Sequence, residues 1–247
     1  MIDPPLLPVF TSEVSPQTLT RRQRWIDLCF VIGVTLLPPI LASANYAVHP
    51  ENLQVFVGTS MRPVSYISTY VTGLAVLFYV LWKRGSDSSF FGKLMEGVDI
   101  FRGIAIWATT FLASAIAAVT YTMIYQHVQG RLPHGLDFAQ ILGRQFPGLF
   151  IVLLFINPWF EELIVRGFLM TELTQLTNAT VAIVASTVVQ ASYHLYEGSW
   201  GMVQLVPIFL LYSIYYARTR RLFPVIVAHT LADYLPLLWY ALHHRAR

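Results

Sequence analysis

The chain has few charged residues. Only 12% of its 247 residues are Asp, Glu, Lys or Arg, whereas an ordinary soluble domain has roughly 25%. Hydrophobic residues make up 55% of the chain, and the mean hydropathy is +0.57. A soluble domain of this size could not bury so much apolar surface, and a disordered chain would contain far fewer apolar residues. The composition therefore predicts a membrane protein that crosses the bilayer several times.

Cysteine is also scarce, since Cys29 is the only one in the chain. A single cysteine excludes an intrachain disulfide and a metal site of the CxxC type. Because Cys29 lies inside an apolar run, we expect it to be buried and unreactive. The chain lacks the HExxH and GxGD signatures of zinc-dependent and presenilin-type membrane proteases. Its basic residues form short clusters between apolar runs and not one stripe, so no nucleic-acid partner is expected.

Several apolar runs are long enough to cross the hydrocarbon core of a bilayer, which takes about 20 helical residues. The seven runs are residues 26–46, 64–82, 103–125, 147–172, 179–196, 202–217 and 222–243. An additional turn or broken helix within 138–156 would make eight. The predicted fold class is therefore all-α, a polytopic membrane protein with about seven, or eight, transmembrane helices. Pro38 and Pro39 lie inside the first run and are expected to kink it.

The Lys and Arg residues in the loops predict the orientation of the chain. We expect residues 1–24 to be a cytoplasmic tail and residues 25–247 to be a single transmembrane helical domain in the plasma (inner) membrane, surrounded by lipid. With the N-terminus inside, the inner side collects nine of these residues: Arg21, Arg22, Arg24, Lys83, Arg84, Lys93, Arg218, Arg220 and Arg221. The outer side collects five: Arg62, Arg131, Arg144, Arg245 and Arg247.

Ionisable residues inside the predicted spans are the most informative feature of the sequence. A charged side chain at the centre of a bilayer costs about 2.5–3.5 kcal/mol on insertion scales, so such groups pair with one another or face a water-filled cavity. They lie in three separate spans: Glu161, Glu162 and Arg166 in the fourth, His194 at the end of the fifth, and His229 and Asp233 in the seventh.

The spacing of these residues predicts which of them pair. Side chains four residues apart share one face of a helix, so Glu162 is expected to pair with Arg166, and His229 with Asp233. Glu161 precedes Glu162 directly and diverges from it by about 100°. It is then left to face a cavity with no cation beside it, which suits a general base. Taken one at a time, such residues are often only structural, but their presence in three spans favours a functional cluster.

These residues resemble the three motifs of the CPBP family, the CAAX-protease and bacteriocin-processing enzymes, which are also called Abi proteins and include Rce1-like enzymes. The family patterns are EExxxR, FxxxH, and HxxxN or HxxxD. The chain has Glu161-Glu162-x-x-x-Arg166, then His194 on the next span, then His229-x-x-x-Asp233. The resemblance covers about residues 155–235. One position departs from the family, since Gln190 stands where Phe is usual.

The resemblance implies an intramembrane endopeptidase that acts on a protein or peptide substrate at the membrane. In the glutamate-type mechanism of this family, Glu161 would activate a water molecule with the help of His194. His229 and Asp233 would hold the developing oxyanion or the substrate carbonyl. The other two residues of the first motif would fix the helix that carries the base.

Other interpretations stay open on the sequence alone. No cofactor is favoured, but an older interpretation of the family makes the same residues ligands of a divalent metal, and two His with carboxylates match zinc chemistry. A non-catalytic membrane partner, such as an immunity or regulatory protein, could use the same polar pocket to bind a peptide. A proton-coupled transporter is disfavoured because the chain has no internal repeat. Glu197, three residues after His194, is expected to be a loop residue at the membrane surface.

Overall fold

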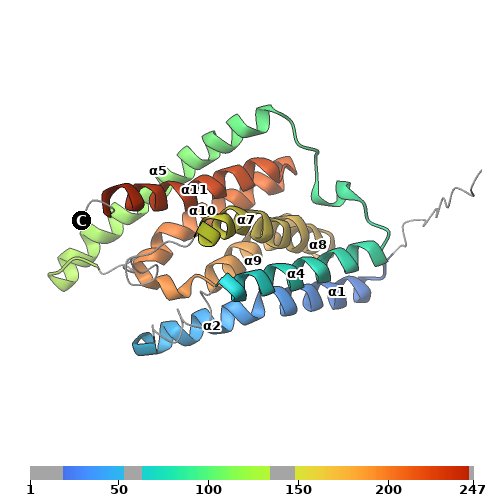
Figure 1. Ribbon diagram of the computed structural model, residues 1–247, viewed down its shortest axis with the longest axis horizontal. Helices are drawn as coiled ribbons and strands as arrows, with labels where there is room; N and C mark the ends of the chain where they lie inside the picture. Colours follow the sequence, from blue (N-terminus) through green and yellow to red (C-terminus); the bar gives the residue numbers. More distant parts are fainter. Residues whose placement is uncertain (1–18, 53–62, 134–147, 245–247) are drawn as a thin grey trace, which may run out of the picture.

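The computed structural model describes residues 19–52, 63–133 and 148–244, and in these ranges every regular element is helical (Figure 1). The predicted all-α fold class is therefore confirmed. The first three predicted spans correspond to α1 (Arg21–Thr35) with α2 (Leu37–Val48), α4 (Pro63–Lys83) and α5 (Val98–Gln129). The fourth is a continuous run of α7 (Gly148–Glu162), the π-helix η3 (Leu163–Met170) and α8 (Thr171–Leu176). The last three correspond to α9 (Ala179–Ser192), α10 (Gly198–Thr219) and α11 (Phe223–His244).

The lengths of these helices suit a membrane. Three stretches of the described chain are long and apolar enough to cross one, namely Val64–Lys83, Val98–Gln129 and Leu195–Thr219. Helices α1 and α2 qualify together as a fourth, bent span. The count of seven spans and the division at residue 24 stay predictions. Residues 138–147 of the additional helix lie outside the described ranges.

The bend in the first span confirms the predicted kink. Helices α1 and α2 meet at an angle of 52°, and prolines occupy the first turn of α2. Proline has no amide hydrogen to give to the preceding turn, so the hydrogen-bond ladder of α1 stops at Leu36.

The expectation for Cys29 is wrong, because this residue is exposed. Helix α1 packs against α4, and the buried residues on this stretch of α1 are Leu28 and Val31. Successive helical residues are turned by about 100°, so Cys29 lies on the outer face of the helix. An apolar neighbourhood in the sequence does not distinguish a core-facing residue from one that faces lipid.

The helices pack around the run of α7, η3 and α8, which lies in the middle of the bundle (Figure 1). Helices α1 and α4 lie side by side, while α5 packs against α10 and α11. The centre of the core comes from η3, where Ile164, Val165 and Phe168 are 0% exposed. Helix α5 approaches α11 closely at Gly103, where a Cβ atom would lie 2.6 Å from the side chain of Val227. The most central element therefore follows directly after the carboxylate doublet.

One end of the bundle collects buried cations and their partners. Arg84, only 4% exposed, lies 2.8 Å from carboxylate oxygens of both Asp27 and Glu172. Nearby, Arg221 lies 2.6 Å from Glu96. Hydrogen bonds from Arg221 and from a second arginine hold the pKa of the Glu96 carboxyl below its usual value. Asp27, Glu172 and Glu96 are thus paired with arginines at this end of the bundle.

Candidate active site

The first motif lies where α7 passes into the π-helix. Glu161 and Glu162 are the last residues of α7, and Arg166 is inside η3. A π-helix is wider than an α-helix, and short π segments often occur at functional sites. Glu162 and Arg166 are both 0% exposed, and Nη1 of Arg166 lies 3.2 Å from Oε1 of Glu162. The predicted ion pair is confirmed, and it is fully buried.

Arg166 also joins neighbouring helices. Its Nη2 donates to the backbone carbonyl of Phe209 on α10 over 3.0 Å, and its Nη1 donates to the side-chain oxygen of Gln190 on α9. A guanidinium has only donors, so it satisfies acceptors from three helices at once. Arg166 therefore fixes the end of α7 relative to α9 and α10.

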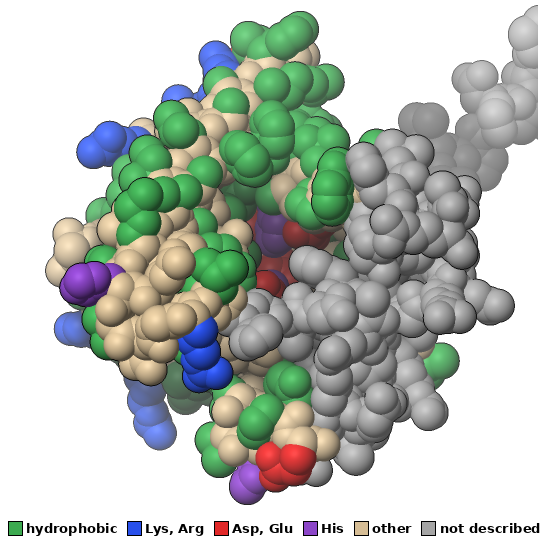
Figure 2. Space-filling view, turned by 90° about the vertical axis from the view of Figure 1, so that its left-hand side faces the viewer, with side chains coloured by type: hydrophobic (Ala, Val, Ile, Leu, Met, Phe, Trp, Pro, Cys, Tyr) green, Lys and Arg blue, Asp and Glu red, His purple; other side chains and the backbone are tan. Residues whose placement is uncertain are grey.

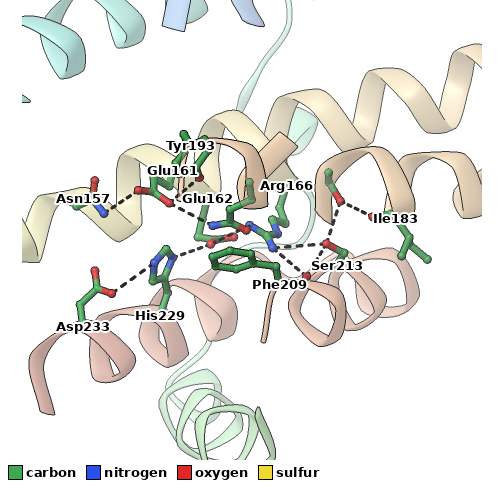
Figure 3. A network of polar contacts seen from close by, with 12 residues as sticks. Asn157, Glu161, Glu162, Arg166, Ile183, Tyr193, Phe209, Ser213, His229 and Asp233 are labelled. Carbon is green, nitrogen blue, oxygen red and sulfur yellow. Dashed lines mark hydrogen bonds and ion pairs between the residues drawn. The ribbon is translucent and has the colours of Figure 1, made fainter. Parts of the chain in front are cut away.

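The third motif joins the cluster from α11. Nδ1 of His229 lies 2.8 Å from Oε1 of Glu162, and its Nε2 lies 3.6 Å from Oδ1 of Asp233. The predicted pairing of His229 with Asp233 is confirmed. Both ring nitrogens thus face carboxylates, and the ring links α7 to α11 (Figure 3).

Glu161 is held by three neutral side chains. Its Oε1 accepts a hydrogen bond of 2.8 Å from Nδ2 of Asn157. Its Oε2 accepts one of 3.1 Å from Nε2 of Gln190 and one of 2.7 Å from the Tyr193 hydroxyl. Figure 3 shows the carboxylate between Asn157 and Tyr193. Glu161 is 7% exposed, and Gln190 lies between it and Arg166.

The other hydrogen bonds of Asn157 and Gln190 determine which end of each side-chain amide faces Glu161. The Tyr70 hydroxyl donates to Oδ1 of Asn157 over 2.8 Å, so the amide nitrogen of Asn157 faces Glu161. Arg166 can only donate, so it takes the amide oxygen of Gln190 and turns the nitrogen toward Glu161. A carboxylate offers about four acceptor positions. Three are filled by these donors, and the remaining one is on Oε1.

His194 lies beside this cluster. Its ring centroid is 4.9 Å from that of Tyr193, which contacts Glu161. Nδ1 of His194 lies 2.9 Å from Oε1 of Glu197. Its Nε2 is buried and has no hydrogen-bond partner among the described residues. The second motif is therefore adjacent to Glu161 through Tyr193, and within the described chain no hydrogen bond joins the two motif residues directly.

The polar cluster lies under a hollow in the surface. Figure 2 shows Asp or Glu side chains together with His side chains at the bottom of this hollow, on the face at the left-hand end of Figure 1. The side chains of Asp233 and His194 are 24% and 16% exposed. Residues from three predicted spans therefore meet where molecules from outside the bundle can reach them.

Several residues of the cluster were not predicted from the sequence. Asn157 stands four residues before Glu161, a spacing that places both on one face of α7, but no motif marks it. Tyr70 and Tyr193 carry no such signal. The expectation that Glu197 is a surface loop residue is wrong, because it lies in the short helix η4 (Leu195–Glu197) and contacts His194.

The arrangement does not fit the divalent-metal interpretation. Among the described residues, no three His, Cys, Asp or Glu side chains are grouped so that they could hold a metal ion. Glu161 accepts from neutral donors, and both nitrogens of His229 face carboxylates.

Comparison with known families covers the part of the chain that holds this cluster. Residues 143–235 match the family model described as type II CAAX prenyl endopeptidase Rce1-like. This segment is therefore similar to Rce1-like domains. The match confirms the resemblance drawn from the motifs and supports a CAAX-protease-type intramembrane peptidase. The matched segment contains all the motif residues, while Tyr70 contributes from outside it. Comparisons with curated proteins and with solved structures found no match.

Proposed function

We propose that the protein is an intramembrane endopeptidase that hydrolyses a peptide bond of a membrane-associated protein or peptide, with a water molecule activated by Glu161. One observation carries this proposal: a nearly buried carboxylate, oriented by three neutral donors, lies in the segment similar to Rce1-like domains, beneath an open hollow (Figure 2). Orientation without a paired cation leaves the carboxylate able to accept a proton.

In the first step, the remaining acceptor position on Oε1 of Glu161 binds a water molecule. Glu161 takes one proton from this water, and the water oxygen forms a bond to the carbonyl carbon of the substrate. Nε2 of His194, which has no hydrogen-bond partner in the described part of the chain, accepts the other hydrogen of the same water and so orients the water oxygen toward the substrate. A positioned general base of this kind contributes about 10²–10⁴-fold to the rate.

In the second step, the tetrahedral intermediate carries a negative oxygen that needs a donor. His229 supplies Nε2–H as an imidazolium, with hydrogen on both ring nitrogens, because Glu162 lies 2.8 Å from Nδ1 and Asp233 lies 3.6 Å from Nε2. The carbon–nitrogen bond then breaks, and Glu161 returns its proton to the leaving amine. Arg166 keeps Glu162 in place throughout.

Replacement of Gln190 tests the role of the donors around Glu161. Gln190→Met keeps the length of the side chain but removes its hydrogen bonds with Oε2 of Glu161 and with Arg166, and a hydrogen bond to a charged group is worth about 1.5–3 kcal/mol. We expect kcat to fall by about 10–100-fold, while KM stays unchanged because Gln190 is 0% exposed. Thr187→Val, at a buried position on the same helix whose hydroxyl donates to the carbonyl of Ile183, is the control. A folded Gln190→Met enzyme with the kcat of Thr187→Val would contradict the assignment.

The distribution of cations supports an orientation in the membrane. Lys and Arg residues gather at the end of the bundle where α1 begins and α4 and α10 end, and such residues favour the cytoplasmic side. We propose that this end faces the cytoplasm, with the N-terminus, and that the protein resides in the plasma membrane.

The proposed function can be tested by comparing the termini of cellular proteins with and without the active enzyme. Cells that lack the protein are supplied with the natural chain or with Glu161→Gln, and the termini of their membrane-associated proteins are compared by mass spectrometry. We expect at least one new terminus with the natural chain and none with Glu161→Gln. Identical termini in both cells, together with a phenotype that Glu161→Gln restores, would instead identify a non-catalytic partner.

A further inference from the structure

We infer that Glu197 is a positioning residue of the site, which fixes His194 with hydrogen on Nδ1 and leaves its Nε2 as an acceptor. This inference rests on the proposed function for its consequence, since His194 orients the water there. The carboxylate of Glu197 lies 2.9 Å from Nδ1 of His194, and the two side chains are only 22% and 16% exposed. The contact is therefore a partly buried one and not a solvated surface pair.

The chemistry of the contact determines which nitrogen carries hydrogen. An ionised carboxylate only accepts hydrogen bonds, so Nδ1 of His194 must be the donor. In the neutral ring, Nε2 is then an acceptor. This Nε2 is the buried atom that has no partner among the described residues. Glu197 thus leaves an acceptor free at the edge of the ring that does not face it.

The backbone around Glu197 is shaped to bring it back onto His194. The amide of Glu197 donates to the carbonyl of His194 over 2.9 Å, which closes a tight turn. Gly198 follows with φ +70°, a conformation that side chains disfavour. A Cβ atom on Gly201 would lie 2.4 Å from Cβ of Glu197 and 3.1 Å from its Oε2. The Glu197 side chain therefore fills space that only glycine at position 201 leaves open.

The packing of the ring leaves Glu197 to decide its orientation. The rings of Tyr193, Phe209 and Tyr196 lie 4.9, 5.2 and 5.9 Å from the His194 ring, between centroids. These apolar contacts hold the position of the ring but do not distinguish its two nitrogens. The Glu197 carboxylate does distinguish them, because it contacts Nδ1.

The other imidazole of the site is held in the same way. Nδ1 of His229 lies 2.8 Å from Glu162, as Nδ1 of His194 lies 2.9 Å from Glu197. Both rings thus have a glutamate on Nδ1. The first glutamate belongs to the EExxxR motif, whereas Glu197 belongs to none of the three motifs.

The tautomer of His194 can be measured without a substrate. The full chain is labelled with ¹⁵N-histidine and placed in lipid nanodiscs, and the His194 signal is assigned from its loss in His194→Gln. We expect ¹⁵N shifts of an Nδ1–H ring in the natural chain and in Glu161→Gln, and a loss of this signature in Glu197→Ala. An Nε2–H ring in the natural chain, or an unchanged signature in Glu197→Ala, would overturn the inference. This readout does not depend on whether the protein cleaves peptides.

Kinetics on the peptide cleaved by the natural chain then separate positioning from a structural role. We expect Glu197→Ala to lower kcat on the order of 10-fold, the size typical when a partner that orients a functional histidine is lost, with KM unchanged. Glu197→Gln should retain most activity because its amide oxygen still accepts from Nδ1–H. Gly201→Ala should behave as Glu197→Ala does, while Gly33→Ala, where a Cβ meets nothing within 4 Å, should not. Equal activity of Glu197→Ala and Glu197→Gln would contradict the positioning role.

Discussion

Glu161→Gln should abolish almost all peptide cleavage. The side chain keeps its size and remains between Asn157, Gln190 and Tyr193, but an amide cannot take a proton from water. A general base contributes about 10²–10⁴-fold, so kcat should fall by that factor. The measurement is turnover of the client peptide by purified protein in lipid nanodiscs, with the released fragment quantified by mass spectrometry.

The control for this variant is Glu51→Gln, which changes the same chemical group at an exposed position. Its kcat should equal that of the natural chain. If Glu161→Gln retained full turnover while folding normally, Glu161 would not be the base. Another group of the cluster would then be the base, and the first candidate is Nε2 of His194, which no described residue contacts by a hydrogen bond.

Arg166→Met should cause the largest loss of stability. The change removes the ion pair to Glu162 and the hydrogen bonds to Gln190 and Phe209, and it leaves the buried Glu162 carboxylate without its guanidinium partner. Breaking a buried pair by removing one partner costs about 3–5 kcal/mol. We expect the free energy of unfolding to fall by that amount, as measured by denaturant or thermal unfolding in detergent micelles followed by tryptophan fluorescence.

Arg218→Met is the matched control, because Arg218 is an exposed arginine at the end of α10. It should change the unfolding free energy by less than about 0.5 kcal/mol, as surface substitutions usually do. An Arg166→Met protein as stable as this control would show that the buried pair does not hold the end of α7.

Much of the fold could be predicted because the bilayer sets the length of an apolar run. The bend at Pro38 and Pro39 was also predictable, since proline breaks the helix ladder wherever it stands inside a helix. Within one helix, spacing alone predicts contacts, and the pairs Glu162–Arg166 and His229–Asp233 follow from the four-residue rule.

Contacts between helices could not be predicted in the same way. The donors Tyr193 and Gln190 reach Glu161 from α9, and their position depends on how far α9 is shifted and rotated relative to α7. A single sequence contains no periodicity that fixes this register. The π-helix after Glu162 adds to the difficulty, because a wider turn moves every later residue off the face predicted for an α-helix.

The two wrong expectations have local causes. Cys29 lies in an apolar stretch of the sequence. In a membrane protein, apolar residues occur both in the core and on the face toward lipid, so hydropathy does not distinguish these two positions. Glu197 follows a predicted span and precedes Gly198, a pattern typical of a loop. What places it on His194 is the tight turn of η4 and the space at Gly201, and neither is visible as a motif.

The accessibility of single cysteines to water tests the central claim most directly, namely that side chains from separate helices meet around one open, wet pocket. In a Cys29→Ser background, Asp233→Cys and Leu112→Cys are treated with a water-soluble methanethiosulfonate in intact nanodiscs. Leu112 is 61% exposed on α5, and α5 supplies none of the residues described in the cluster. Because thiolates form only in contact with water, we predict rapid modification of Asp233→Cys and none of Leu112→Cys. An unreactive Asp233→Cys, or equal rates at both positions, would contradict the account.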